Sequence, residues 1–174
     1  PRLSCDPVAA VLRGLLSVLF RRIRMGPPSS FRKPLGHDAV HVWAARSDRV
    51  EPELWDRYVD LLSDGERQRL GRFRFERNRR EFCVAHVLVR EALSNYADVA
   101  PADWAFETNP HGRPEVAAAF DVDLRFNLSH TDGLVACAVA RNVDVGVDVE
   151  AMDRRAETVE IAERFFSAQE LADL

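Results

Sequence analysis

The sequence predicts an α/β (α+β) fold with two similar halves, the first complete and the second incomplete. Alternating apolar and polar residues predict strands, and a long stretch with apolar residues at helical spacing predicts a helix between them. Strands around Val42 and Val147 are 105 residues apart, and capping boxes that begin at Ser63 and Ser167 are 104 apart. Landmarks that recur in the same order at one offset indicate an internal repeat.

Charge separates the beginning of the chain from the rest. The 174 residues are 47% apolar, enough for one domain with a core. The first 35 residues hold seven basic side chains and one acidic one, a net charge of +6, whereas the remainder holds 17 basic and 27 acidic residues, a net −10. Apolar residues between Val8 and Ile23 follow helical spacing, and the run from Leu15 to Phe20 is too short to span a membrane. We therefore expect residues 1–36 to form a basic amphipathic head and linker outside the fold.

That head is open to several interpretations, namely a transit peptide, a surface helix, or an extension upstream of a start at Met25. The three cysteines form no CxxC pair: Cys5, Cys83 and Cys137. They are expected to be reduced, packed thiols, which is typical of a cytoplasmic protein.

The first half of the domain opens with a strand and continues with helices. Residues 40–43 (VHVW) form the expected strand, a helix begins at Pro52, and a second begins at the capping box of Ser63 and Glu66. A longer helix follows, and its buried stripe comprises Phe82, Ala85, Val89, Ala92, Leu93 and Tyr96. Residues Arg79, Arg80 and Arg90 are predicted to face away from this stripe.

Shorter elements complete this half. Residues 101–104 are expected as a helix or turn, 105–108 as a strand, and 109–114 as a loop in which Gly112 allows close backbone approach to a ligand. A strand at 126–129, a turn at 130–133 and a returning strand at 134–140 follow.

The stretch 143–150 (VDVGVDVE) is predicted to be a strand with valines on one face and carboxylates on the other. Asp148 and Glu150 are two residues apart, roughly 6.6 Å along a strand, so their side chains can share one hard cation such as Mg²⁺. The alternative is a half-buried strand with a solvated acidic face.

His130 lies at the end of a predicted strand, between the hydroxyls of Ser129 and Thr131. This arrangement suits a phosphate, whereas a lone SHT more often places the histidine as the cap of a turn. A serine hydrolase triad is excluded because Ser129, His130 and Asp132 are too close in sequence to converge in line. Seven arginines between Arg67 and Arg80 form either an anion-binding surface or a solvated face with ion pairs.

Four short motifs occur along the chain in one order: GRP at 112–114, FNLSHT at 126–131, VGVDVE at 145–150 and RFFSAQE at 164–170. Together with the arginine-rich stretch before them they cover about residues 40–174. The set resembles the signature of the 4′-phosphopantetheinyl transferases, of the larger surfactin-synthetase-activating (Sfp-like) type. The resemblance implies a pseudo-twofold fold with the ligand between two halves, residues 37–142 being the first and residues 143–174 the start of the second.

The resemblance also implies transfer of 4′-phosphopantetheine from coenzyme A to a serine of an apo acyl or peptidyl carrier protein, with Mg²⁺ as cofactor and 3′,5′-ADP as product. Asp148 and Glu150 are the implied metal ligands. The implied coenzyme A contacts are Arg77, Gly112, Arg113, Pro114, Asn127, Ser129 and His130. The family pattern shows Asp where this chain has Asn78. The catalytic base is expected in a helix beyond Leu174, so no catalytic residue is assigned within 1–174.

Two other functions are compatible with the sequence. One is a non-catalytic fragment that binds coenzyme A or a nucleotide. The other is an arginine-rich nucleic-acid-binding domain, which is disfavoured because no aromatic stacking platform accompanies the arginines. We expect neither a nucleic acid nor a membrane as a partner, and we expect a cytoplasmic location.

Overall fold

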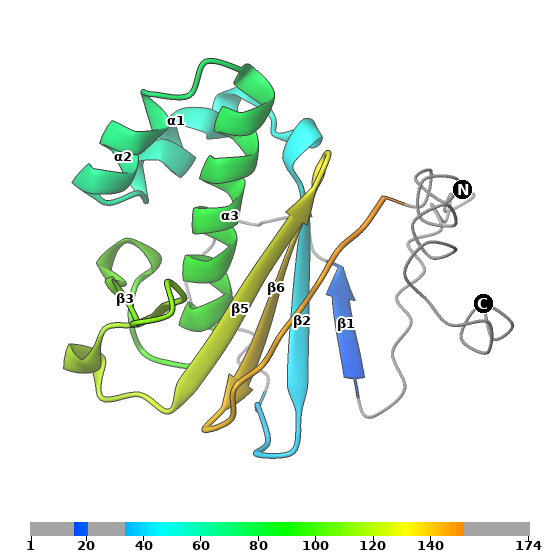
Figure 1. The fold of residues 1–174 in the computed structure, drawn as a ribbon, viewed down its shortest axis with the longest axis vertical. Helices are drawn as coiled ribbons and strands as arrows, with labels where there is room; N and C mark the ends of the chain where they lie inside the picture. The colour runs from blue at the N-terminus through cyan, green and yellow to red at the C-terminus, as the bar shows by residue number, and fades with distance from the viewer. Residues whose placement is uncertain (1–15, 21–33, 152–174) are drawn as a thin grey trace, which may run out of the picture.

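A computed structural model of the chain describes residues 16–20 and 34–151. In order, its elements are β1 (Leu16–Phe20), β2 (Val40–Arg46), η1 (Ser47–Arg49), α1 (Pro52–Asp60), α2 (Asp64–Leu70), α3 (Glu76–Ser94), η2 (Pro101–Asp103), β3 (Phe106–Thr108), β4 (Pro114–Val116), η3 (Ala118–Phe120), β5 (Leu124–Thr131) and β6 (Leu134–Arg141). One sheet has the strand order β1-β2-β6-β5, in which β1 is parallel to β2 and the other pairs are antiparallel (Figure 1). The strands β3 and β4 form a separate antiparallel pair. The predicted α+β class is confirmed.

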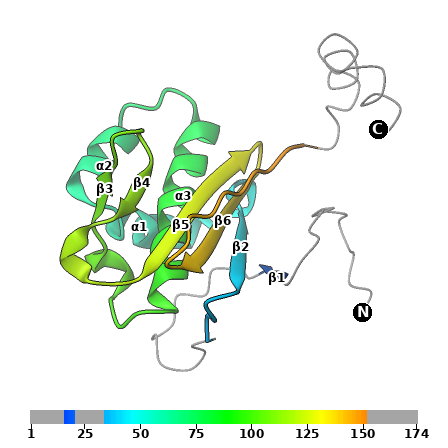
Figure 2. The same cartoon turned by 60° about the horizontal axis from the view of Figure 1, so that its bottom comes forward.

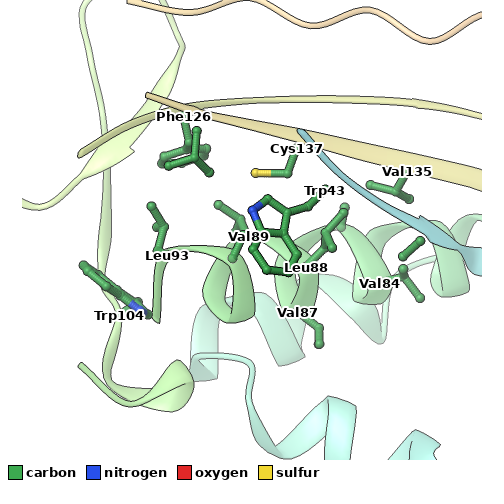
Figure 3. Close-up of a cluster of buried hydrophobic side chains, with 14 of the residues drawn as sticks. Trp43, Val84, Val87, Leu88, Val89, Leu93, Trp104, Phe126, Val135 and Cys137 are labelled. Carbon is green, nitrogen blue, oxygen red and sulfur yellow. The ribbon is translucent and has the colours of Figure 1, made fainter. Parts of the chain in front are cut away.

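The main core lies between α3 and one face of this sheet. In β6 the residues Val135, Cys137 and Val139 are fully buried. Figure 3 shows Val135 and Cys137 beside the side chains of Val84, Leu88 and Val89 from α3. The alternate residues of β6, Ala136, Ala138 and Ala140, are also buried, on the opposite face of the sheet. The strand therefore places larger side chains against the helix and small ones on the other side.

The smaller elements cover the helix rather than the far face of the sheet. Helices α1 and α2 and the β3–β4 pair lie on the α3 side (Figure 2). The helix starts follow the predicted signals: α1 begins at Pro52, and the predicted capping box of α2 is present. Ser63 Oγ accepts a hydrogen bond from Glu66 N at 3.3 Å, and Ser63 N donates one to Glu66 Oε2 at 2.7 Å.

The prediction for the first helical stretch is wrong in part. Leu16–Phe20 form strand β1 and pair with β2 from Val40 to Ala44, so these five residues belong to the sheet and not to a helix outside the fold. A short apolar run is compatible with either helix or strand periodicity, and pairing with another strand decided the outcome here. The rest of the predicted head lies outside the described residues.

The stretch 143–150 is extended but is not a strand of the sheet. Its carboxylates are exposed and Val145, Val147 and Val149 are half-buried, so the predicted alternation of faces is correct from Val145 onward, whereas Val143 is 51% exposed. The predicted pairing of its backbone with a neighbouring strand is wrong, because Val147 N and Val149 N donate to the side chains of Asn127 and Ser129 in β5. Residues 143–151 are called the acidic segment below.

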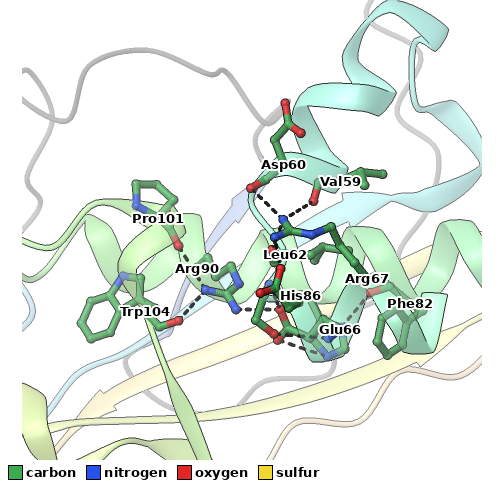
Figure 4. A network of polar contacts seen from close by, with 12 residues as sticks. Val59, Asp60, Leu62, Glu66, Arg67, Phe82, His86, Arg90, Pro101 and Trp104 are labelled. Atoms are coloured by element: carbon green, nitrogen blue, oxygen red, sulfur yellow. Dashed lines mark hydrogen bonds and ion pairs between the residues drawn. The ribbon is translucent and has the colours of Figure 1, made fainter. Parts of the chain in front are cut away.

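Arg90 also departs from its predicted position. It was expected to face away from the buried stripe of α3, yet its side chain is 1% exposed. Its guanidinium donates to Glu66 Oε2 at 2.7 Å, to the Trp104 carbonyl at 2.6 Å and to the Pro101 carbonyl at 3.3 Å (Figure 4). These bonds use Nη1 and Nη2, whereas the buried Nε of Arg90 has no hydrogen-bond partner. A charged side chain is tolerated in a core when most of its donors are paired in this way.

The predicted second half cannot be compared with the structure. The motif RFFSAQE, the capping box at Ser167 and most of the expected repeat lie outside the described residues. Among the helices within 34–151, none is long and apolar enough to cross a lipid bilayer.

Candidate functional site

The end of β5 presents chemically useful side chains on two faces. Phe126 is buried toward α3, and by strand alternation His130 points to that same face while Asn127 and Ser129 point to the other. The predicted turn is shorter than expected, since β5 runs to Thr131 and only Asp132 and Gly133 connect it to β6. Gly133 has a φ of +75°, which glycine adopts without strain.

On the α3 face, two basic side chains surround one carboxylate. Glu81 Oε1 lies 3.9 Å from Arg77 Nε, and Glu81 Oε2 lies 3.9 Å from His130 Nδ1. Arg77 Nη1 also donates to Asp132 Oδ2 at 3.2 Å. The side chains of Arg77 and His130 are 66% and 59% exposed, whereas that of Glu81 is 13% exposed. The two predicted phosphate ligands are thus brought together, and both remain accessible from solvent.

An open groove of about 410 Å³ lies beside this cluster. It is lined by Ser47, Asp48, Glu76, Arg77, Arg80, Asp132 and Gly133. The groove carries charges of both signs, and Arg80 is itself paired with Glu76 at 3.1 Å. Arg77 and Asp132 both line the groove and also belong to the cluster around Glu81.

On the opposite face, β5 holds the acidic segment through side-chain hydrogen bonds. Ser129 Oγ accepts from Val149 N at 3.1 Å and donates to Asp148 Oδ1 at 3.0 Å. Asn127 Oδ1 accepts from Val147 N at 3.0 Å. Asp148 and Glu150 are both exposed. Asn127 and Ser129, predicted as ligand contacts, bond to the acidic segment in this structure.

The two carboxylates fit one part of a magnesium site. They supply only oxygen donors from alternate residues of an extended backbone, and Mg²⁺ commonly binds one or two protein carboxylates and keeps waters or phosphate oxygens for the rest. Asp148 is oriented by Ser129, as metal ligands often are by a neighbouring hydrogen bond. No group of three or more His, Cys, Asp or Glu suited to a metal occurs in the part of the chain that the structure describes.

Arg113 connects the GRP loop to both β5 and the acidic segment. Its Nη2 donates to the Phe126 carbonyl at 3.0 Å and to the Val145 carbonyl at 3.2 Å, and its Nη1 lies 3.6 Å from Asp144 Oδ1. These contacts use both Nη atoms of the guanidinium, whereas its buried Nε has no hydrogen-bond partner. Gly112 has a φ of +83° in the turn before it, and Pro114 starts β4.

Sequence reasoning missed Glu81 and Asp132 as members of the site. A signal for Glu81 was available, because it lies four residues after Arg77 on the predicted helix, at the spacing of neighbouring side chains. That His130 would meet the same carboxylate depends on how β5 packs against α3, which sequence spacing does not reveal.

The chain is thus an α+β protein. At the end of β5, basic groups lie on one side of the sheet and the acidic segment is bound on the other side. Residues 47–142 match the family described as 4′-phosphopantetheinyl transferase, N-terminal. The chain belongs to the 4′-phosphopantetheinyl transferase family.

Individual relatives agree with this assignment. The chain is 34% identical over 134 residues to the 4′-phosphopantetheinyl transferase HetI of Nostoc sp., covering 76% of this chain and 56% of the relative. It is 30% identical over 136 residues to the 4′-phosphopantetheinyl transferase Sfp of Bacillus subtilis, covering 78% and 58%. The chain therefore spans about half the length of the curated relatives that it matches.

A solved holo-(acyl-carrier-protein) synthase from Bacillus anthracis, in complex with coenzyme A, aligns with a TM-score of 0.45 and 15% identity, over 57% of this chain and 91% of that one. A likeness at this level adds nothing to the assignment.

Proposed function

We propose that the protein transfers the 4′-phosphopantetheine group of coenzyme A to a serine of an apo acyl or peptidyl carrier protein. The observation that carries the proposal is the arrangement at the end of β5, where Arg77 and His130 converge on one face and Ser129 holds Asp148 on the other. In a member of this family, that arrangement provides both a phosphate-binding side and a cation-binding side. We expect the protein to act in the cytoplasm, in keeping with the free, buried thiols of Cys83 and Cys137.

In the proposed reaction the carrier serine Oγ attacks the β-phosphorus of coenzyme A. A new phosphodiester bond forms, the bond to the leaving 3′,5′-ADP breaks, and the serine proton passes to a base that we place outside the described residues. Arg77 and His130 would bind the nucleotide phosphates, because an arginine fork and an imidazole N–H both donate to phosphate oxygens.

Asp148 and Glu150 would hold Mg²⁺. In such a site the cation would stabilise the negative charge of the pyrophosphate and of the phosphoryl group that is being transferred. Ser129 keeps Asp148 oriented through its hydroxyl, and Arg113 and Asn127 keep the acidic segment against β5. These residues would act before any ligand binds, by fixing the two carboxylates in place.

Mass spectrometry tests the proposal directly. The full-length protein is incubated with coenzyme A, Mg²⁺ and an apo carrier protein, and the carrier should gain about 340 Da, the mass of the phosphopantetheine group. A carrier whose target serine is replaced by alanine is the matched control and should gain nothing. An unmodified wild-type carrier, under conditions where a Bacillus subtilis relative modifies it, would contradict the proposal.

Removing either basic side chain should weaken coenzyme A binding. Arg77→Ala and His130→Ala should each raise the KM for coenzyme A by about tenfold, since each loses a charge-assisted hydrogen bond worth roughly 1.5–3 kcal/mol that solvent exposure partly offsets. Steady-state kinetics measure the change. Arg57→Ala, on α1, is the control and should leave the KM unchanged. A lower kcat at an unchanged KM would argue against phosphate binding by these residues.

Arg113 distinguishes positioning of the carboxylates from contact with coenzyme A. If it acts by tethering the acidic segment, Arg113→Met should raise the Mg²⁺ concentration for half-maximal rate by about tenfold, in the range seen for residues that orient metal ligands. The KM for coenzyme A, measured at saturating Mg²⁺, should stay within about twofold of wild type. The opposite pattern, a raised KM with unchanged Mg²⁺ dependence, would assign Arg113 to the ligand as the sequence resemblance implied.

A further inference from the structure

Glu81 occupies an unexpected position for a carboxylate. It lies between Arg77 and His130, the two side chains that the proposed function assigns to phosphate binding, with one oxygen 3.9 Å from each. At this distance the contacts are too long for good hydrogen bonds, so both basic groups keep donors for a ligand. The carboxylate is the least exposed member of the cluster and is fixed by its place on α3.

We propose that Glu81 is a specificity-determining residue that lowers the selectivity of this site for the 3′-phosphate of coenzyme A. The inference rests on the proposed function, and it takes the 3′-phosphate as the nucleotide phosphate that Arg77 and His130 contact. A substrate of the same class that lacks the 3′-phosphate, dephospho-coenzyme A, is then used nearly as well as coenzyme A.

The electrostatics of the cluster carry this argument. A phosphate that contacts both Arg77 and His130 must lie close to Glu81, because Glu81 lies beside both of them. Like charges in such proximity repel, and each raises the free energy of the bound state. Asp132 bonds to Arg77 from another direction, so two carboxylates face the two basic groups. The two negative charges of a 3′-phosphate therefore add little binding free energy at this site.

The exposure of the four side chains determines which of them can adapt. Arg77, His130 and Asp132 are all more than half exposed and can turn toward or away from a ligand. Glu81 is 13% exposed, so its surroundings leave it less room to turn than the other three have. A bound phosphate can displace Asp132 from Arg77, but it cannot easily displace Glu81. The negative charge of Glu81 therefore stays close to the bound phosphate and repels it.

Binding of two nucleotides that differ only in the 3′-phosphate tests the inference without relying on catalysis. Calorimetry with the full-length protein should give dissociation constants for 3′,5′-ADP and 5′-AMP within about threefold of each other. Glu81→Gln removes the charge and keeps the shape, and it should tighten 3′,5′-ADP by about tenfold while changing 5′-AMP by less than about twofold. Kinetics with coenzyme A and dephospho-coenzyme A should show the same pattern in KM.

Glu76→Gln is the matched control. It removes the same charge from the same helix, but Glu76 pairs with Arg79 and Arg80 rather than with Arg77 or His130. It should leave the ratio of the two dissociation constants unchanged. A wild-type preference for 3′,5′-ADP of more than about thirtyfold would overturn the inference even if Glu81→Gln failed to fold.

Other results bear on one proposal or on both. Equal tightening of both nucleotides by Glu81→Gln, or an equal effect of Glu76→Gln, would overturn the role of Glu81 and leave the proposed function intact. Failure of the wild-type protein to bind either nucleotide or to modify a carrier would reject the proposed function, and the inference with it.

Discussion

Asp148→Ala should lower the rate of phosphopantetheine transfer by roughly a hundredfold or more, about 3 kcal/mol of transition-state stabilisation. Asp148 is one of the two carboxylates proposed to hold Mg²⁺, and Ser129 Oγ orients it through a 3.0 Å hydrogen bond. Removing one of two protein ligands from a cation that prefers six oxygens leaves the site too weak to hold it. Transfer assays across a range of Mg²⁺ concentrations measure the loss, which excess metal should only partly restore.

The stability of the variant separates this role from a structural one. Asp148 is exposed, so its replacement should change the free energy of unfolding by no more than about 0.5 kcal/mol. Asp144→Ala removes the same charge from the same segment, and it should keep the transfer rate within about twofold of wild type because its 3.6 Å contact with Arg113 is exposed. Unchanged transfer and unchanged Mg²⁺ dependence in Asp148→Ala would show that the metal site lies elsewhere.

The sequence correctly predicted that Asp148 and Glu150 are exposed, but it did not predict how their segment is held against β5. From Val145 onward, period-two alternation correctly places valines on one side of the acidic segment and carboxylates on the other. The same alternation also predicts a strand that pairs through its backbone with a neighbour, and the segment does not form such a strand. The difference arises because β5 offers Asn127 and Ser129 side chains as partners for the backbone of Val147 and Val149. Which face of β5 meets the segment is a tertiary property that local alternation does not encode.

Charge patterning shows a similar limit. The arginine-rich stretch indicated anion binding or surface ion pairs, and the structure contains ion pairs at several of its positions, such as those of Arg79 and Arg80 with Glu76. Spacing on a single helix predicts these pairs, because residues three and four apart are neighbours. It does not predict the partners that come from other elements, such as His130 for Glu81 or Glu66 for Arg90.

The largest loss of stability is expected at Arg90. Arg90→Met keeps much of the apolar stem but leaves Glu66 without its cationic partner and the Trp104 and Pro101 carbonyls without a donor. Breaking a buried ion pair from one side costs about 3–5 kcal/mol, and because the Glu66 side chain is 16% exposed we expect the lower end of that range. Urea unfolding should therefore show a large decrease in the midpoint with an unchanged slope.

The surface pair of Arg80 and Glu76 provides the matched control. Their side chains are 41% and 56% exposed, and exposed pairs contribute about 0–1 kcal/mol, so Arg80→Met should have little effect on stability. A loss of less than about 1 kcal/mol in Arg90→Met would show that the buried pair contributes no more than a surface one.

The pH dependence provides a second check on the pair. Burial alone would raise the pKa of Glu66, but the Ser63 N–H and the Arg90 charge outweigh burial, so the pKa lies below its ordinary value of 4.5. Because the folded state holds this proton less tightly than the unfolded state, the contribution is complete above about pH 4.5 and is lost as the pH falls through the lowered folded value. The difference in stability between wild type and Arg90→Met should shrink over that interval.

A double variant identifies the source of the loss. Glu66→Gln removes the buried charge but keeps an oxygen that can accept from Ser63 N, so the capping box of α2 can persist. Combined with Arg90→Met, it should recover at least about 1 kcal/mol relative to Arg90→Met alone, since no unpaired carboxylate then remains in the core. If the double variant is instead as unstable as the sum of the two single variants, the loss comes from the Trp104 and Pro101 carbonyls and from packing around Arg90, and not from the charge on Glu66.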